Sequence, residues 1–214
     1  MKSSKKNWKL AKTLSAFALI LAVLLGGVAC SPASDDGAPT GTPAPGDVSA
    51  AEKILNIAIA AEPSTLDPNA GIGDTWMFTI GHLYEAVTRL DDVNDAVPGM
   101  ALDWELSADG LTYVFTIRED NGWSDGTPAT AADFEYGIKR ILRHESGENW
   151  ASLVFDIKNA AQVFAGELPI EEAGIKAEGN KLTITLEQPE PYFPKLLTFA
   201  PYFGVNQAFV ESVG

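Results

Sequence analysis

Few residues in this sequence could carry out chemistry. It contains two histidines, His82 and His144, and a single cysteine, Cys30. There is no G-x-S-x-G nucleophile elbow, no H-E-x-x-H pattern, and no cysteine or histidine pair at metal-ligand spacing. His82 lies within a helix pattern, where an interfacial histidine is commoner than a catalytic base. We therefore expect a protein that is not an enzyme and has no catalytic residue, no metal site and no cofactor.

Cys30 follows a segment typical of exported proteins. Five lysines within the first 12 residues precede an apolar run over residues 14–29, which gives a basic n-region and a hydrophobic h-region. The run is 16 residues long and is too short for an ordinary membrane-spanning helix. A short anchoring helix is the alternative interpretation. A lone cysteine in an exported chain has no internal disulfide partner, so it must serve another purpose.

The stretch Gly27-Val28-Ala29-Cys30 resembles a bacterial lipoprotein signal, in which the cysteine is acylated and becomes the mature N-terminus. Gly27 departs from that pattern, because an aliphatic residue is usual there. The resemblance implies a signal peptide over residues 1–29 and lipid attachment at Cys30. It also implies an exported protein anchored on the outer face of the cytoplasmic membrane, facing the periplasm where an outer membrane exists. Each buried methylene contributes about 0.8 kcal/mol, so a diacyl group anchors stably.

The next segment and the net charge limit the partners. Residues 31–49 are almost all Pro, Gly, Ser, Thr, Ala and Asp, which bury too little apolar surface to fold. We expect residues 30–52 to form a disordered tether. The formal net charge is −14, and removal of five signal lysines leaves about −19. Such a chain repels phosphates, so no nucleic-acid partner is expected.

The remaining residues show alternating strand and helix patterns. Residues 53–60 have the alternation of a strand with one buried face, and residues 76–90 have the spacing of a helix that covers it. A meander is expected over residues 104–107 and 111–118, with a tight turn at Asp109-Gly110 between them. Farther on, the pattern predicts a helix, a hairpin and a short helix. These cover residues 157–165, residues 174–177 with 182–186, and residues 192–199.

The stretch from Gly122 to Leu142 specifies one helix particularly well. A tight turn at Asp125-Gly126 precedes Thr130, an N-cap residue, and the Asp133 side chain can reach back to the Thr130 amide. An apolar stripe follows, made of Phe134, Ile138, Ile141 and Leu142. Basic residues then lie at the negative end of the helix dipole, and Gly147 is expected to stop the helix. These residues predict architecture rather than catalysis.

Several blocks in this order resemble the peptide-binding group of ABC-importer substrate-binding proteins, the oligopeptide and dipeptide receptors of solute-binding family 5. The blocks are E-P-S-T-L-D-P (62–68), H-L-Y-E-A-V (82–87), P-G-M-A-L-D-W-E-L-S-A-D-G-L-T-Y-V-F-T-I-R (98–118), W-S-D-G-T-P-A-T-A-A-D-F (123–134) and P-Y-F (191–193). Together they extend over residues 53–214 without large gaps. Such a series is far more specific than any single motif.

The resemblance implies a mixed α/β (α+β) fold of the periplasmic-binding-protein type II-like kind, present only in part. Members of the family have two lobes around a cleft. By position, residues 53–88 would form the first part of lobe I, residues 89–198 the family's small extra domain, and residues 199–214 the start of the return to lobe I. The second lobe would be missing.

The resemblance also implies a function and a site. Family members capture peptides in an extended conformation, largely through backbone hydrogen bonds, and deliver them to an ABC permease and its ATPase without altering the ligand. A monomer is expected. Gly71, Ile72, Gly73 and Asp74 match the family loop that runs along the peptide, while Trp150 and Phe199 match cleft-facing aromatic positions. A plain surface loop and two core aromatic residues are the structural alternatives.

Other functions stay open at this point. Relatives of the same shape resemble receptors for nickel chelates, haem, oligosaccharides or signalling peptides. A secreted lipoprotein hydrolase is the alternative from a different class, and no catalytic motif supports it. A truncated product without function of its own is a third possibility.

Overall fold

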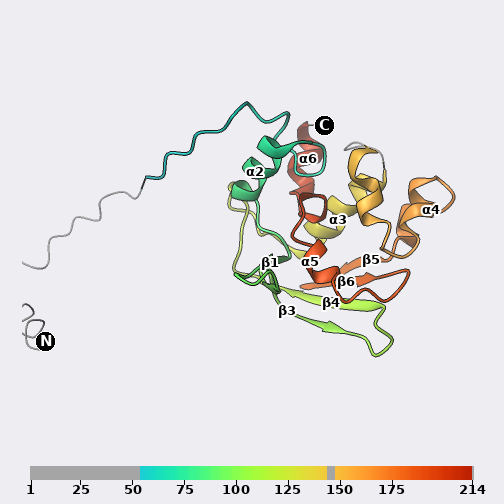
Figure 1. The fold of residues 1–214 in the computed structure, drawn as a ribbon. Coiled ribbons are helices and arrows are strands. Elements are labelled where there is room, and N and C mark those ends of the chain that lie inside the picture. The colour runs from blue at the N-terminus through green and yellow to red at the C-terminus, as the bar shows by residue number, and fades with distance from the viewer. Residues whose placement is uncertain (1–53, 144–147, 214) are drawn as a thin grey trace, which may run out of the picture. The chain divides into compact units, whose positions relative to one another are not determined.

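A computed structural model describes residues 54–143 and 148–213 (Figure 1). The predicted signal peptide, the tether, the lipid site at Cys30, and the helix stop at Gly147 lie outside the described residues. None of the helices in the described ranges is long and apolar enough to cross a bilayer.

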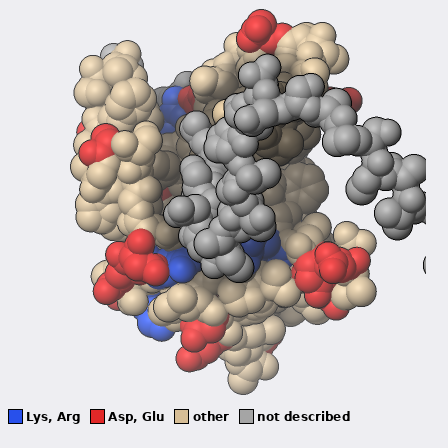
Figure 2. Space-filling view, turned by 90° about the vertical axis from the view of Figure 1, so that its left-hand side faces the viewer, with Lys and Arg blue, Asp and Glu red and all other residues tan. Residues whose placement is uncertain are grey.

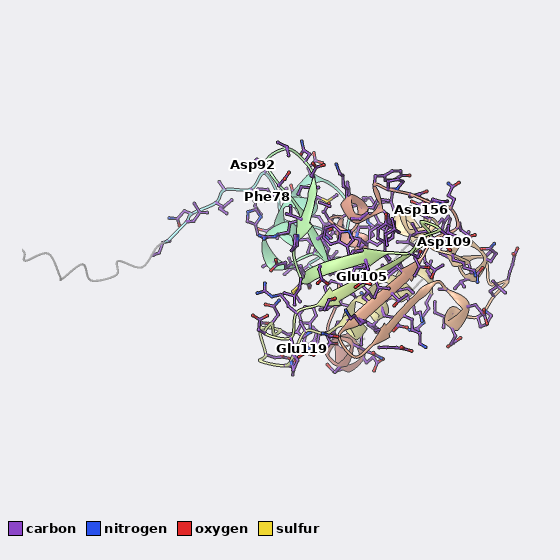
Figure 3. The ribbon with its side chains drawn as sticks, turned by 90° about the horizontal axis from the view of Figure 1, so that it is seen from below. Phe78, Asp92, Glu105, Asp109, Glu119 and Asp156 are labelled. Atoms are coloured by element: carbon purple, nitrogen blue, oxygen red, sulfur yellow. The ribbon has the colours of Figure 1, made fainter. Side chains whose placement is uncertain are left out.

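The centre of the fold is a four-stranded antiparallel sheet of two hairpins, in the order β3-β4-β6-β5. One hairpin joins β3 (Ala101–Leu106) to β4 (Thr112–Ile117), and the other joins β5 (Ile175–Glu178) to β6 (Lys181–Thr185). Both hairpins were predicted and the structure confirms them, although β3 begins before the predicted residue 104. Figure 3, seen from below, shows Glu105 on β3 and places Asp109 and Glu119 beyond the two ends of β4.

One face of β4 carries the core. Tyr113, Phe115 and Ile117 are buried, whereas Val114 and Thr116 on the opposite face are half-buried. The register places Phe115 opposite Leu182 of β6 and Trp104 of β3. Pairing of β4 with β6 therefore joins two hairpins that are about 65 residues apart in sequence, with Lys181 opposite Thr116.

Helix α3 (Ala131–Leu142) covers this core with the predicted stripe, because Phe134, Ile138, Ile141 and Leu142 are all buried. The Thr130 amide donates to Asp133 Oδ2 at 2.8 Å, as the capping pattern predicted. At Gly137 the helix approaches another segment closely: a Cβ there would lie 2.5 Å from the Phe203 carbonyl oxygen. The absence of a side chain at Gly137 therefore lets residues 203–205 cross the helix.

We expect Asp133→Ala to lower the free energy of unfolding by about 1 kcal/mol, because the Thr130 amide loses its acceptor. The indole N–H of Trp123, 3.4 Å from Asp133 Oδ2, loses its partner as well. Urea unfolding monitored by far-UV circular dichroism measures the change. Asp103→Ala, at an exposed position of β3, is the control and should change stability by less than about 0.5 kcal/mol. Equal losses in the two variants would contradict the capping role.

The prediction for the first strand and the helix after it was partly wrong. Residues 54–59 form no strand, and the apolar side chains of Ile54, Leu55, Ile57 and Ile59 are exposed. Alternation shows which face of a strand would be apolar, but a strand also needs a neighbour with which to form hydrogen bonds. No described strand pairs with residues 54–59. Helix α2 (Asp74–Leu83) begins earlier and ends earlier than the predicted 76–90.

After α2 the chain is extended, and it is held in this form by the pairing of β1 with β2 and by a hydrogen bond from Thr88. Tyr84 has φ −120° and ψ 153°. Strand β1 (Thr88–Leu90) then pairs with β2 (Ala96–Pro98), and residues 91–95 connect the two strands. The Thr88 hydroxyl is buried and donates to the Pro194 carbonyl at 2.5 Å.

Short helices complete the fold. Helices α4 (Ala160–Phe164) and α5 (Phe193–Leu196) lie inside the predicted ranges but are shorter. The sequence patterns did not indicate the 3-10 helices or the last helix. These are η1 (Glu148–Val154), η2 (Ile170–Glu172), η3 (Ala200–Tyr202) and α6 (Gln207–Val213).

Candidate functional site

The loop before α2 is held between two tryptophans. Trp150, from η1, donates its indole N–H to the Gly71 carbonyl at 2.6 Å. Trp76, in the first turn of α2, donates to the Asp67 carbonyl at 3.1 Å. The two indoles stack with ring centroids 5.7 Å apart and planes inclined by 18°. The structure thus brings Gly71 and Trp150 together.

Gly71 has no room for a side chain. A Cβ at this position would lie 2.1 Å from Trp76 Nε1 and 2.2 Å from Trp76 Cδ1. Because the indole of Trp76 lies against the Cα of Gly71, the main chain here passes between an aromatic ring and the hydrogen bond from Trp150. The residue type at 71 is therefore required by packing.

The rest of the predicted loop faces solvent. Ile72, Gly73 and Asp74 are exposed, and Gly73 has φ +91°, a conformation that favours glycine. The Gly73 carbonyl accepts from the Met77 amide at 3.0 Å and so begins α2. Among the described residues, neither the amide nor the carbonyl of Ile72 makes a hydrogen bond. Ile72 therefore offers a free donor and a free acceptor on an otherwise fixed loop.

Phe199 lies beside the same cluster but outside it. Its side chain is 44% exposed, whereas the next residue, Ala200, is buried against Trp76. The Phe199 carbonyl accepts from the Tyr202 amide at 3.0 Å. Phe199 is thus a surface residue, and the alternative of a core aromatic does not apply to it.

A cavity of about 900 Å³ lies next to residues 65–68, and none of the six predicted ligand residues lines it. Its apolar walls include Leu66, Tyr84, Trp123 and Phe134. Burial raises the pKa of the Tyr84 hydroxyl, and the nearby Asp67 carboxylate adds to this effect. Residues 65–68 line the cavity, and the chain then continues into the predicted ligand loop.

Asp67 connects these two regions. Its Oδ2 lies 2.6 Å from Arg140 Nη1 in the last turn of α3. Its Oδ1 accepts from the Asn69 amide at 2.9 Å, and its carbonyl accepts from Trp76. The negative C-terminal end of α3 thus carries a cation that anchors the start of the loop. The sequence patterns gave no sign of this pair, because its members are 73 positions apart.

Two acidic residues, Asp156 and Glu190, lie close to Tyr202, and Tyr202 bonds to η1. Glu190 is 5% exposed and lies close to Asp156, which is labelled in Figure 3. Burial raises the pKa of Asp156, and the charge of Glu190 raises it further. The Tyr202 hydroxyl donates to the Leu153 carbonyl in η1, and burial raises its pKa.

This acidic pair predicts a pH-dependent stability. The folded-state pKa of Asp156 is raised, so its protonated form stabilises the fold at low pH, and this contribution is lost as pH rises through the folded-state pKa. We expect Asp156→Asn, which cannot ionise, to be more stable than the wild type at pH 7. The advantage should disappear below about pH 4. Denaturant unfolding at several pH values measures it.

Asp120 is the matched control with the opposite sign. The Arg118 guanidinium, 2.9 Å away, holds the pKa of Asp120 below its usual range. Asp120→Asn should therefore be less stable than the wild type at pH 7 and should match it at low pH. An Asp156→Asn protein whose stability follows the wild type at every pH would refute the prediction.

The surface of the described residues is strongly acidic. Figure 2 shows acidic side chains in several separate groups on one face, with few basic side chains between them. No group of three or more potential metal ligands occurs among the residues described. At the loop of residues 71–74 the described contacts are hydrogen bonds from indole groups and the stacking of two aromatic rings.

Comparison with known proteins identifies the relationship. The family model of bacterial extracellular solute-binding proteins, family 5 Middle, matches residues 95–211. The chain belongs to this family. The family resemblance found in the sequence is confirmed.

Similar proteins are known in sequence and in structure. The chain is 32% identical over 208 residues to the dipeptide-binding protein DppE of Bacillus subtilis, covering 97% of this chain and 37% of that protein. The solved structure of OppA from Burkholderia pseudomallei is 36% identical, with a TM-score of 0.68 over 73% of this chain and 31% of that one. OppA of Haemophilus influenzae in complex with RPPGFSPFR is 28% identical, with a TM-score of 0.67 over 72% and 31%.

These comparisons establish the mixed α/β fold of the periplasmic-binding-protein type II-like kind, and they place the relatives outside the cytoplasm. The family 5 chain spans about a third of the length of the relatives it matches. The domain bounds 53–88, 89–198 and 199–214, like the six ligand residues, stay predictions.

Proposed function

We propose that this chain contributes to peptide capture by an extracytoplasmic binding protein of an ABC importer, without chemistry on the ligand. The observation that carries the proposal is the loop at residues 71–74. Its start is fixed by Trp76 and Trp150, while Ile72 presents an unpaired amide and carbonyl. A chain held extended beside Ile72 could exchange both backbone hydrogen bonds, as an added strand does. These two backbone hydrogen bonds do not depend on the ligand's side chains.

The proposal extends to the exported form and its partners. We infer that residues 1–29 are removed, that Cys30 is acylated, and that residues 30–52 tether the folded part to the outer face of the membrane. The loaded protein, a monomer, delivers its peptide to the permease and its ATPase. Mass spectrometry of the exported protein checks the anchor, and an unmodified Cys30 would refute it.

Nuclear magnetic resonance titration of the exported chain tests peptide binding. Tripeptides of mixed sequence should shift the amide signals of Ile72 and Gly73, whereas maltotriose and a nickel chelate should not. Shifts produced only by the sugar or the chelate would favour one of the other solute classes instead. No shift with any peptide up to millimolar concentration would contradict the proposal, because a dissociation constant of 1 mM corresponds to only about 4 kcal/mol.

Trp150→Ala should weaken peptide binding by about tenfold, because an aromatic contact at the centre of a site typically contributes more than 1 kcal/mol. Leu106→Ala is the control, since Leu106 is exposed on β3. The Leu106→Ala variant should bind peptide with the same affinity as the wild type. Equal affinities of the Trp150→Ala protein and the wild type would remove Trp150 from the site.

A further inference from the structure

Trp150 has only one polar atom, and the protein itself uses it. Its indole N–H donates to the Gly71 carbonyl at 2.6 Å. One face of its ring stacks on Trp76. Trp150 is nevertheless only half-buried, and the one polar atom of its side chain is already paired. A ligand that reaches Trp150 meets an aromatic surface without a hydrogen-bond donor.

Trp76 determines that arrangement. Its side chain is 1% exposed and occupies the space beside the Cα of Gly71. It is tied through its own N–H to the Asp67 carbonyl, and Asp67 is tied to Arg140. Trp76 thus contacts both partners of the hydrogen bond between Trp150 and Gly71. No other described ring stacks on Trp150.

We propose that Trp76 is a positioning residue that fixes the ring of Trp150 and the main chain at Gly71, so that the site selects peptides with an aromatic or aliphatic side chain beside Trp150. The inference rests on the proposed function, because it specifies which peptides the site prefers. Aromatic pairs favour particular geometries, so the preference depends on the orientation of the Trp150 ring as well as on its presence.

The test compares selectivity rather than affinity alone. Three tripeptides carry one phenylalanine among alanines, at each position in turn, and three matched tripeptides carry serine there. The exported form of the whole chain should bind the best phenylalanine peptide about three- to tenfold more tightly than its serine counterpart. Trp150→Leu should reduce this ratio towards one. Trp76→Leu should do the same although Trp150 is still present, whereas Trp76→Phe, which keeps a ring for stacking, should retain most of it.

A purely structural role of Trp76 gives a different result. Trp76→Leu would then lower the melting temperature and leave the ratio unchanged, and that outcome would overturn the proposal. Trp104→Leu controls for the loss of a tryptophan, since Trp104 packs against Phe115 in the sheet. It should leave the ratio unchanged.

Near-ultraviolet circular dichroism separates this inference from the proposed function. Two indoles 5.7 Å apart should give a coupled signal that both Trp76→Phe and Trp150→Phe remove and Trp104→Phe does not. Exchange of the Met77 amide, which donates to the Gly73 carbonyl of the loop at 3.0 Å, should also accelerate in Trp76→Leu. If no peptide binds but both signatures appear, the proposed function fails and the positioning of Trp150 stands. If both signatures are absent, the positioning inference fails whatever the ligand.

Discussion

Phe115→Ala is expected to lower the free energy of unfolding by about 3–5 kcal/mol, the range for removing a buried phenylalanine. Phe115 is 0% exposed and lies in the middle of β4. Its ring contacts those of Trp104 and Tyr113, with centroids 6.0 Å and 5.9 Å away. These neighbours belong to a sheet and cannot collapse into the space that alanine leaves, so the cavity persists.

The expected loss is a large part of the total, because domains of this size are stable by only about 5–15 kcal/mol. Urea denaturation followed by fluorescence measures the free energy of unfolding. If its slope against urea concentration is the same in the variant and the wild type, the two proteins unfold in the same reaction. If the alanine variant does not fold, Phe115→Leu gives a smaller and measurable loss. Val114→Ala, on the half-buried opposite face, should lose about 1 kcal/mol. A loss at Phe115 no greater than that at Val114 would show that this core is not built as described.

Asp67→Ala is expected to lower the free energy of unfolding by about 2–3 kcal/mol, between the values for exposed and fully buried ion pairs. The side chains of Arg140 and Asp67 are 12% and 24% exposed. Removal of the carboxylate leaves the Arg140 charge with little water, and the Asn69 amide loses an acceptor. The loop that leads to Gly71 should therefore loosen as well.

A double-mutant cycle isolates the pair. Asp67→Ala, Arg140→Met and the double variant should give a coupling energy of at least about 1 kcal/mol. The matched control is the exposed pair of Lys195 and Asp95, 2.8 Å apart, with side chains 44% and 69% exposed. Its coupling should be at most about half of that value. Equal coupling in the two cycles would mean that Asp67 and Arg140 behave as an ordinary surface pair.

Hydrogen exchange in the loop of residues 71–74 should also depend on the ion pair of Asp67 with Arg140. We expect the amide of Met77, which donates to the Gly73 carbonyl of the loop, to exchange faster in Asp67→Ala than in the wild type, while the amide of Phe115 changes only with global stability. Unchanged exchange of the Met77 amide would show that the ion pair does not stabilise the loop of the candidate site.

The sequence by itself determined the features that arise from neighbouring residues. Period-two alternation predicted both hairpins of the sheet, and the Thr130–Asp133 pattern predicted the start of α3. Ordered blocks of residues predicted the family. These succeed because turn chemistry, capping and alternation act over a few positions, where backbone sterics and local hydrogen bonds decide the outcome.

Only the tertiary structure decided what depends on partners distant in sequence. The alternation in residues 54–59 predicted a strand, but no described strand lies beside this segment to pair with it. The predicted helix ends at Leu83, and the chain after it is extended and bonds to a distant segment through Thr88 and Pro194. The contact of Trp76 with Trp150 joins positions 74 residues apart. Side-chain periodicity specifies which face is apolar but does not specify what covers it, because burial is non-directional and any apolar surface of the right shape can supply it. The environment of the candidate site is therefore a property of the folded chain.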